Sequence, residues 1–166
     1  MNNLNLKNLT EALIDTFLEA GKISKEFRQK GLKVTMKADN TPVTDADLAV
    51  DHLLRSKIAS LTPDIPIISE ETVDLKTKNN NKTFWLIDPI DGTREYIKNK
   101  DEYTLNAALV IELNPAIGLV YAPKKNRLFF SYGKGLAFEI RGGEKTILNC
   151  KKVNTNKIIA LMNSDK

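Results

Sequence analysis

Acidic side chains follow two short apolar stretches of the sequence, and these acids are the residues best suited to chemistry. The apolar stretch 84–87 runs into Asp88 and Asp91, and the stretch 65–68 runs into Glu70. Mg²⁺ prefers a few carboxylate oxygens together with water and substrate oxygens. Two strand ends that both deliver acids therefore predict a shared site where divalent cations meet a phosphate group.

The segment around the two aspartates is also suited to hold an anion. Pro89 stiffens the chain between them, and Gly92 permits a tight turn or a close backbone approach to a ligand. Thr93 offers a hydroxyl and an N–H at a predicted helix start, where anions are favoured. An Asp-Pro-x-Asp-Gly sequence alone is equally compatible with a simple turn. The apolar stretch before it and the threonine after it favour a binding site.

A third polar element lies upstream, at Thr44 and Asp47. Their spacing is that of a capping box, in which the threonine caps a helix and the acid occupies its third position. From these residues alone, capping is the favoured interpretation.

Composition excludes several classes of function. His52 is the only histidine and Cys150 the only cysteine, so neither a His/Cys zinc site nor a histidine-activated nucleophile nor an internal disulfide is expected. The net charge of +4 comes from scattered lysines without interleaved aromatics, so no nucleic-acid polymer is expected as a partner. No stretch resembles a transmembrane span or a signal peptide, and we expect a cytoplasmic location.

The pattern of apolar residues predicts the elements that position these side chains. Apolar residues recur at helical spacing between residues 6 and 27, with a stop at Gly31, and again from Thr44 to about Leu61. A polar loop is expected at 38–42. Short strands are predicted at 32–37, 65–68, 84–87, 104–112, 116–121, 128–132, 136–140 and 145–148. Two helices followed by sequential hairpins indicate an α+β fold, with helices on one face of a largely antiparallel sheet.

One related signature has a different spacing. Haloacid-dehalogenase phosphatases also carry aspartates and an Asp-Gly-Thr sequence after an apolar strand, but only one residue separates their two aspartates. Here Pro89 and Ile90 both intervene between Asp88 and Asp91. This spacing argues against a covalent aspartyl-phosphate route.

Taken together, the motifs resemble those of the inositol monophosphatase superfamily of Mg²⁺-dependent, lithium-sensitive phosphatases. The resemblance rests on PVT-x-x-D at 42–47, SEE at 69–71 and W-x-IDPIDGT at 85–93, in that order. Within the superfamily, DGTREYI at 91–97 and KADNTPVT at 37–44 are most similar to 3'(2'),5'-bisphosphate nucleotidases. The resemblance implies a layered α/β sandwich whose N-terminal lobe has two long helices packed on a largely antiparallel sheet.

The same resemblance implies roles for individual residues. It implies metal ligands at Glu70, Asp88, the Ile90 carbonyl and Asp91. It implies substrate contacts at Glu70, Ile90, Asp91, Gly92 and Thr93. It also implies a catalytic pair, Asp47 and Thr93, that orients the attacking water. With Mg²⁺ as cofactor, a cation lowers the pKa of bound water, so no histidine is required.

The implied reaction is hydrolysis of the 3'-phosphate of adenosine 3',5'-bisphosphate to AMP and phosphate, a step connected with sulfur metabolism. Two alternatives stay open: an inositol or sugar monophosphatase of the same superfamily, and a catalytically inactive fragment. Family members are longer, so residues 1–156 are expected to form the metal- and phosphate-binding lobe, and 157–166 to begin a truncated second lobe. The resemblance also implies a homodimer and, for a cytoplasmic protein, peripheral contact at the inner membrane face.

Overall fold

The structure is a computed structural model that describes residues 5–72 and 81–149. The expected boundary between residues 156 and 157 and the expected start of a second lobe at 157–166 lie outside these residues. No helix in the described part of the chain is long and apolar enough to cross a membrane.

The first helix, α1 (Leu6–Lys30), forms where the apolar periodicity predicts it. Asn5 caps its start by accepting a hydrogen bond from the Asn8 amide at 3.1 Å, and Gly31 ends it with a φ of 94°. Its buried face includes Leu13 and Phe17, which are fully excluded from solvent. This long helix has one continuous apolar face, and for that reason the spacing of its apolar residues predicts it from the sequence.

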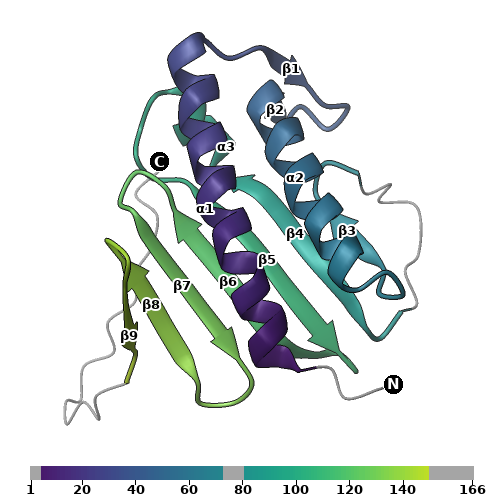
Figure 1. The fold of residues 1–166 in the computed structure, drawn as a ribbon. Coiled ribbons are helices and arrows are strands. Elements are labelled where there is room, and N and C mark those ends of the chain that lie inside the picture. The colour runs from purple at the N-terminus through teal and green to yellow at the C-terminus, as the bar shows by residue number, and fades with distance from the viewer. Residues whose placement is uncertain (1–4, 73–80, 150–166) are drawn as a thin grey trace, which may run out of the picture.

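The second helix, α2 (Asp45–Leu61), packs along α1, and both lie over the same face of the sheet (Figure 1). Thr44 and Asp47 form the predicted capping box at its start. Close contact between α1 and the sheet depends on Gly21, because a Cβ there would lie 2.2 Å from Cε1 of Tyr121.

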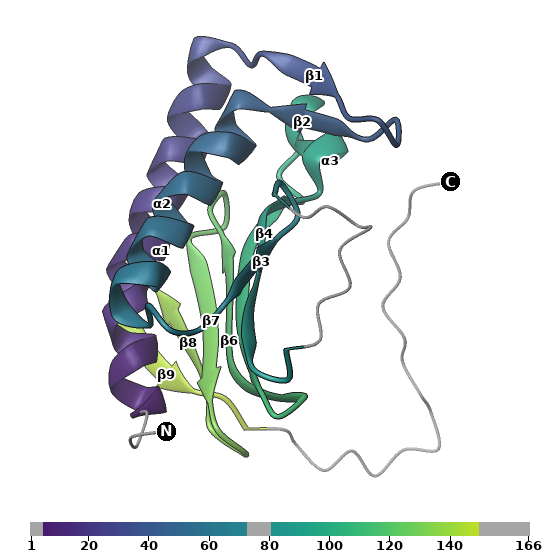
Figure 2. The ribbon, with the colours of Figure 1, turned by 90° about the vertical axis from the view of Figure 1, so that its right-hand side faces the viewer.

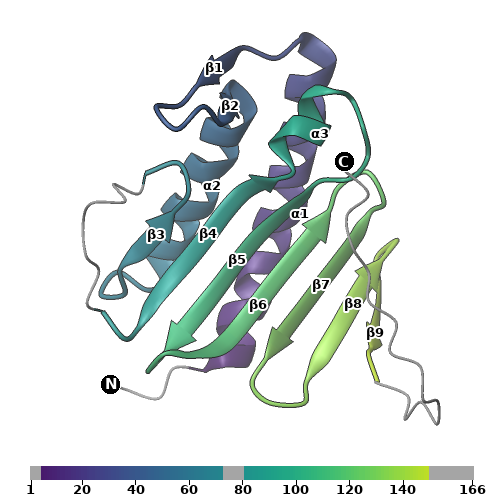
Figure 3. The ribbon, with the colours of Figure 1, turned by 180° about the vertical axis from the view of Figure 1, so that it is seen from behind.

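Seven strands form the main sheet in the order β3-β4-β5-β6-β7-β8-β9 (Figure 3). Their bounds are β3 (Ile67–Ser69), β4 (Phe84–Asp91), β5 (Thr104–Ile111), β6 (Asn114–Ala122), β7 (Arg127–Tyr132), β8 (Ala137–Arg141) and β9 (Glu144–Ile147). The β3–β4 pair is parallel and every other pair is antiparallel. The predicted α+β class, with two long helices on a largely antiparallel sheet, is therefore confirmed.

The core lies between the helices and one face of this sheet, as the edge-on view in Figure 2 shows. Trp85, Ile87, Leu105 and Leu119 contribute side chains from the central strands and are at most 1% exposed. Among the described residues, no helix covers the opposite face of the sheet (Figure 2).

Two elements differ from the sequence prediction. The expected loop 38–42 ends one residue early, because Pro42 already belongs to strand β2 (Pro42–Thr44). This strand pairs antiparallel with β1 (Val34–Met36) as a hairpin separate from the main sheet. Strand β4 continues through Asp91 instead of stopping before Asp88. A short helix, α3 (Thr93–Ile97), then begins directly after Gly92, as expected.

Candidate active site

A β-bulge in β4 brings Asp88 and Asp91 to one face of the sheet. Residues three apart in a regular strand point to opposite faces. In β4, however, Asp88 pairs with Asn106 and Asp91 pairs with Thr104, so one strand has an extra residue between the two pairs. Because Asn106 and Thr104 are two apart in a regular strand, their partners share a face. The bulge thus places the two predicted carboxylates together.

Asp88 is the most strongly perturbed acid of the described chain segments. Its Oδ1 atom is buried and has no hydrogen-bond partner among the described residues. Burial, followed by the negative charges of Glu70 and Asp91, raises the pKa of the Asp88 carboxyl to about 7. A partly buried carboxyl with one unpartnered oxygen, close to other acids, is an environment that a cation would stabilise.

Glu70 reaches this cluster from the end of β3. The parallel pairing of Ser69 with Ile87 sets β3 beside β4, and the Glu70 amide donates to the Ile87 carbonyl at 3.1 Å. The Glu70 carboxylate accepts a hydrogen bond from the Lys37 ammonium at 3.2 Å. Glu71 binds the same ammonium at 3.0 Å. Lys37 therefore lies against Glu70, one of the acids that the sequence assigns to metal binding, and against its neighbour Glu71.

Asp47 and Thr93 meet although they are 46 residues apart. The Thr93 hydroxyl lies 3.3 Å from Oδ1 of Asp47 and 3.0 Å from the Ile90 carbonyl oxygen, and it can donate to either. The other Asp47 oxygen, Oδ2, accepts from the amide of Thr44 at 2.8 Å and from its hydroxyl. Asp47 is thus both the capping residue and a partner of Thr93, and the two interpretations of the sequence are compatible.

Burial raises the pKa of the Asp47 carboxyl, although the hydrogen bonds from Thr44 and Thr93 oppose this effect. Only 1% of Asp47 is exposed. A desolvated carboxylate with a raised pKa and a hydroxyl at its free oxygen can accept a proton through that hydroxyl.

Gly92 joins the bulged strand to α3 in a conformation that other residues rarely adopt. Its φ is 91° and its ψ is 38°, in the left-handed region. A Cβ at this position would also lie 2.8 Å from the Glu102 carbonyl oxygen. Backbone conformation and space both require glycine, because the segment at Glu102 and Tyr103 packs where a side chain would lie.

The donor set fits a hard divalent cation, although the ligands are not fully assembled. Glu70, Asp88, Asp91 and the Ile90 carbonyl offer only oxygen, and the carbonyl retains a lone pair beside its bond to Thr93. Across residues 5–72 and 81–149, no three Asp, Glu, His or Cys side chains converge into a preformed metal centre. Lys37 explains part of this, because it draws the Glu70 carboxylate toward Glu71.

Sequence reasoning gave little weight to Lys37 and did not identify Asn106. The Asn106 amide donates to Oδ2 of Asp91 at 3.3 Å, and its own Oδ1 is buried without a described partner. A polar residue in an otherwise apolar strand such as β5 was the available signal. The sequence also did not identify the buried contact between Ser69 and Asp51, which anchors the end of β3 to α2.

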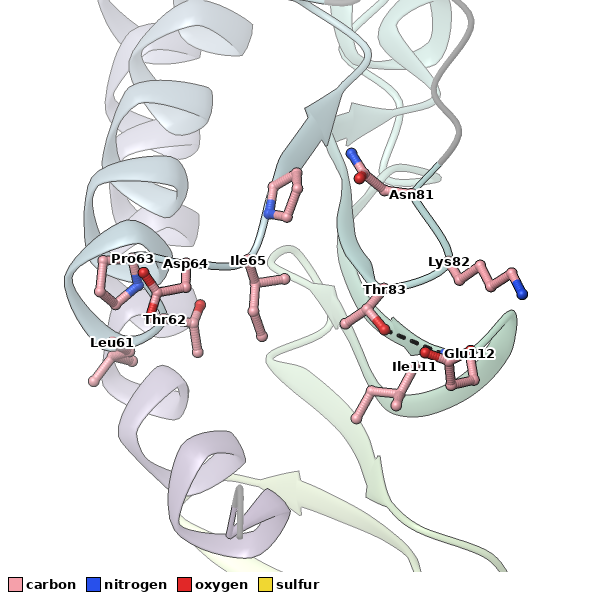
Figure 4. A pocket seen from close by; sticks show the side chains of 11 residues that line it. Leu61, Thr62, Pro63, Asp64, Ile65, Asn81, Lys82, Thr83, Ile111 and Glu112 are labelled. Carbon is pink, nitrogen blue, oxygen red and sulfur yellow. Dashed lines mark hydrogen bonds between the residues drawn. The ribbon is translucent and has the colours of Figure 1, made fainter. Parts of the chain in front are cut away.

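A separate cavity of about 620 Å³ lies at the other end of β4, between the end of α2, the segment before β4 and the β5–β6 turn (Figure 4). Leu61, Ile65 and Ile111 line it together with Thr83 and Glu112. None of the predicted site residues borders this cavity. The candidate active site is therefore the open carboxylate cluster rather than this hollow.

The sequence model of the inositol monophosphatase family matches residues 5–162, so the chain belongs to this family. It is 36% identical over 126 residues to the 3'(2'),5'-bisphosphate nucleotidase CysQ of Aggregatibacter actinomycetemcomitans, covering 75% of this chain and 47% of the relative. Identity to the protein of the same name from Haemophilus influenzae is 35% over 133 residues, covering 79% of this chain and 49% of the relative.

Solved structures agree with this assignment. CysQ from Bacteroides thetaiotaomicron is 32% identical with a TM-score of 0.62, over 85% of this chain and 51% of that protein. Staphylococcal inositol monophosphatase-1 gives a TM-score of 0.73 at 19% identity, over 83% of this chain and 52% of that protein, which establishes the fold alone. The chain spans about half the length of the relatives it matches.

Proposed function

We propose that this chain carries the metal- and phosphate-binding part of a Mg²⁺-dependent phosphomonoesterase that removes the 3'-phosphate of adenosine 3',5'-bisphosphate. The observation that carries the proposal is the partly buried Asp88 carboxyl, whose Oδ1 has no described partner, close to Glu70 and Asp91 and near the Asp47–Thr93 pair. A buried carboxyl oxygen without a partner, crowded by other acids instead of by a cation, supports a site for a bound cation.

In this proposal, Glu70, Asp88, Asp91 and the Ile90 carbonyl hold Mg²⁺. Bound there, Mg²⁺ would lower the pKa of water and neutralise charge on the transferred phosphoryl group. Asn106 holds the Asp91 carboxylate through its 3.3 Å hydrogen bond, which fixes that ligand before a cation arrives.

The Asp47–Thr93 pair positions the attacking water. The single hydroxyl hydrogen of Thr93 is directed to Asp47 or to the Ile90 carbonyl, so the hydroxyl oxygen can accept a hydrogen bond from water. As the water oxygen bonds to phosphorus, the bond from phosphorus to the 3'-oxygen breaks and the released oxygen takes a proton from solvent. The proton of the attacking water passes to Thr93 while Thr93 gives its own proton to Asp47. The raised pKa of the Asp47 carboxyl suits this acceptor role.

The substrate phosphate contacts the open turn formed by Gly92 and Thr93. Gly92 supports this contact through the left-handed backbone, with φ 91°, that joins β4 directly to the start of α3. The choice of a nucleotide bisphosphate is supported by relatives at 35–36% identity that are named 3'(2'),5'-bisphosphate nucleotidases. Because the chain spans about half of each relative, this substrate choice depends on the whole protein and remains a proposal.

Further properties belong to the same proposal. Inhibition by Li⁺, a role in sulfur metabolism, a cytoplasmic location and assembly as a homodimer are what the family resemblance implies. Li⁺ sensitivity is the property that the same assay can measure directly.

Phosphate release from adenosine 3',5'-bisphosphate tests the proposal. The purified chain is assayed with Mg²⁺, with EDTA and with added Li⁺, and inositol 1-phosphate serves as the competing substrate. Thr93→Val should abolish Mg²⁺-dependent release, whereas Thr146→Val, the same change on exposed strand β9, should not. Absence of release from either substrate, with Mg²⁺ binding retained, would identify the chain as a metal-binding lobe without activity.

A further inference from the structure

The β1–β2 hairpin delivers Lys37 to the carboxylate cluster, and no role proposed above uses it. Its turn is well ordered by hydrogen bonds, since the Lys37 amide donates to the Thr41 carbonyl at 2.8 Å and the Asn40 amide donates to the Lys37 carbonyl at 3.0 Å. Asp39 accepts from the Thr41 amide at 3.0 Å and from its hydroxyl at 2.6 Å. The KADNTPVT motif thus builds a preorganised turn directly beside Lys37.

Lys37 binds two acids of unequal exposure. Its ammonium lies 3.0 Å from Glu71, whose side chain is only 4% exposed, and 3.2 Å from Glu70, whose side chain is 47% exposed. Burial raises the pKa of the Glu71 carboxyl, and the hydrogen bond from Lys37 opposes this rise. The hydrogen bonds to Glu71 and Glu70 outweigh the effect of burial on Lys37 and raise its pKa, so it stays a cation.

We propose that the Lys37–Glu71 pair sets the Mg²⁺ affinity of the site, with Lys37 acting as a fixed counter-cation rather than as a ligand. The inference rests on the Mg²⁺ site proposed above. Lys37 offsets the charge of Glu71 and holds one oxygen of Glu70, which limits how strongly the cluster attracts a divalent cation.

The physical reason lies in the number of acids. Two further acids, Glu71 and Asp47, lie near the predicted ligands. The Asp47 charge contributes to the raised pKa of the Glu71 carboxyl, so these two acids interact with each other electrostatically. The affinity of an oxygen site for a divalent cation rises with the number of charged ligands. A fixed lysine beside this cluster lowers the net negative charge by one and keeps Glu71 from serving as an additional ligand. In this proposal, Lys37 of the β1–β2 hairpin therefore weakens the binding of Mg²⁺ at the carboxylate cluster.

Charge-changing variants of the pair test the inference without any substrate. The dissociation constant of Mg²⁺ is measured by calorimetry on metal-free protein. Lys37→Met should bind Mg²⁺ roughly three- to tenfold more tightly, because a positive charge near the divalent cation is removed. Glu71→Gln should bind it weaker by a similar factor, on the order of three- to tenfold, although Glu71 is not a ligand.

Two further variants serve as controls. Lys37→Arg keeps the charge and should stay close to wild type. The double variant Lys37→Met/Glu71→Gln keeps the net charge of the wild-type pair and should return the affinity to within roughly twofold of wild type. Because Glu71→Gln removes the buried carboxyl that Lys37→Met would leave without its partner, the double variant also tests the inference if Lys37→Met folds poorly.

Opposite shifts in the two single variants, cancelling in the double variant, are the expected result. A lysine with a purely structural role would give weaker or unchanged Mg²⁺ binding in Lys37→Met, and that result would overturn the inference while leaving the metal site intact. If the wild-type chain binds no Mg²⁺ at all, the proposed site falls, and this inference falls with it.

Discussion

Replacing Asp88 by asparagine should stabilise the metal-free chain, and the gain should grow with pH. The wild-type carboxylate is partly buried, its Oδ1 has no described partner, and Glu70 and Asp91 repel its charge. Asparagine has nearly the same shape but no charge. The substitution therefore removes the repulsion while largely preserving the packing.

The magnitude follows from the pKa of Asp88. Its value of about 7 in the folded chain lies above the ordinary value of 3.8. A carboxyl with a higher pKa in the folded than in the unfolded chain favours folding while it is protonated. Its contribution to the free energy of unfolding is complete below the unfolded pKa and is lost as pH rises through the folded pKa. Because the carboxyl is partly exposed, solvent screening reduces this loss, which is on the order of 1 kcal/mol at a pH of about 5 and on the order of 2 kcal/mol at a pH of about 8. The advantage of Asp88→Asn should thus increase by on the order of 1 kcal/mol between these conditions.

Urea denaturation in EDTA measures this difference. With a typical dependence of about 2 kcal/mol per molar urea, the midpoint difference between Asp88→Asn and wild type should widen by about 0.5 M from the lower to the higher pH. Asp15→Asn, on the exposed face of α1, is the matched control and should show no such widening. Mg²⁺ should raise the midpoint of wild type but not of Asp88→Asn. A constant or shrinking difference between the two chains would refute the electrostatic argument.

Three further substitutions test the site and its support. Asp47→Asn should reduce phosphate release by about 10²-fold or more with little change in the calorimetric Mg²⁺ affinity, and a large loss of affinity would instead make Asp47 a ligand. Gly92→Ala, with its Cβ 2.8 Å from the Glu102 carbonyl, should lower the unfolding free energy by about 1–3 kcal/mol and abolish release; wild-type stability would contradict this. Gly21→Ala should cost about 1–3 kcal/mol in the same denaturation assay through its clash with Tyr121, and an unchanged midpoint would contradict the close packing of α1 on the sheet.

The helices were predictable because each has a continuous apolar face and a local start or stop signal. Asn5 and Gly31 delimit α1, and the Thr44 capping box starts α2. The strand at Pro42–Thr44 was missed, because three residues with a proline carry no periodic signal. Its strand geometry comes from pairing with Val34–Met36, a contact that is not visible in either segment alone.

The site was predictable in residue type but not in geometry. The spacing around Asp88 and Asp91 indicated a cation and phosphate site, whereas the bulge that places both on one face depends on the register with β5. The parallel register of β3 with β4, which brings Glu70 near, likewise depends on tertiary pairing. The bond from Lys37 to Glu70 could not be inferred, since a single exposed-type lysine has many solvated conformations.

The departures from regular structure in β4 and its continuation are concentrated at one place. The bulge, the unpartnered Asp88 carboxylate and the left-handed Gly92 all lie within residues 88–92. The same strand contributes Trp85, Ile87 and Ile90 to the core, each at most 1% exposed. A segment held this firmly can tolerate a charge and a backbone conformation that cost stability. Features that lower the stability of the fold and are confined to a few residues of a well-packed strand are expected where those residues serve to bind a ligand.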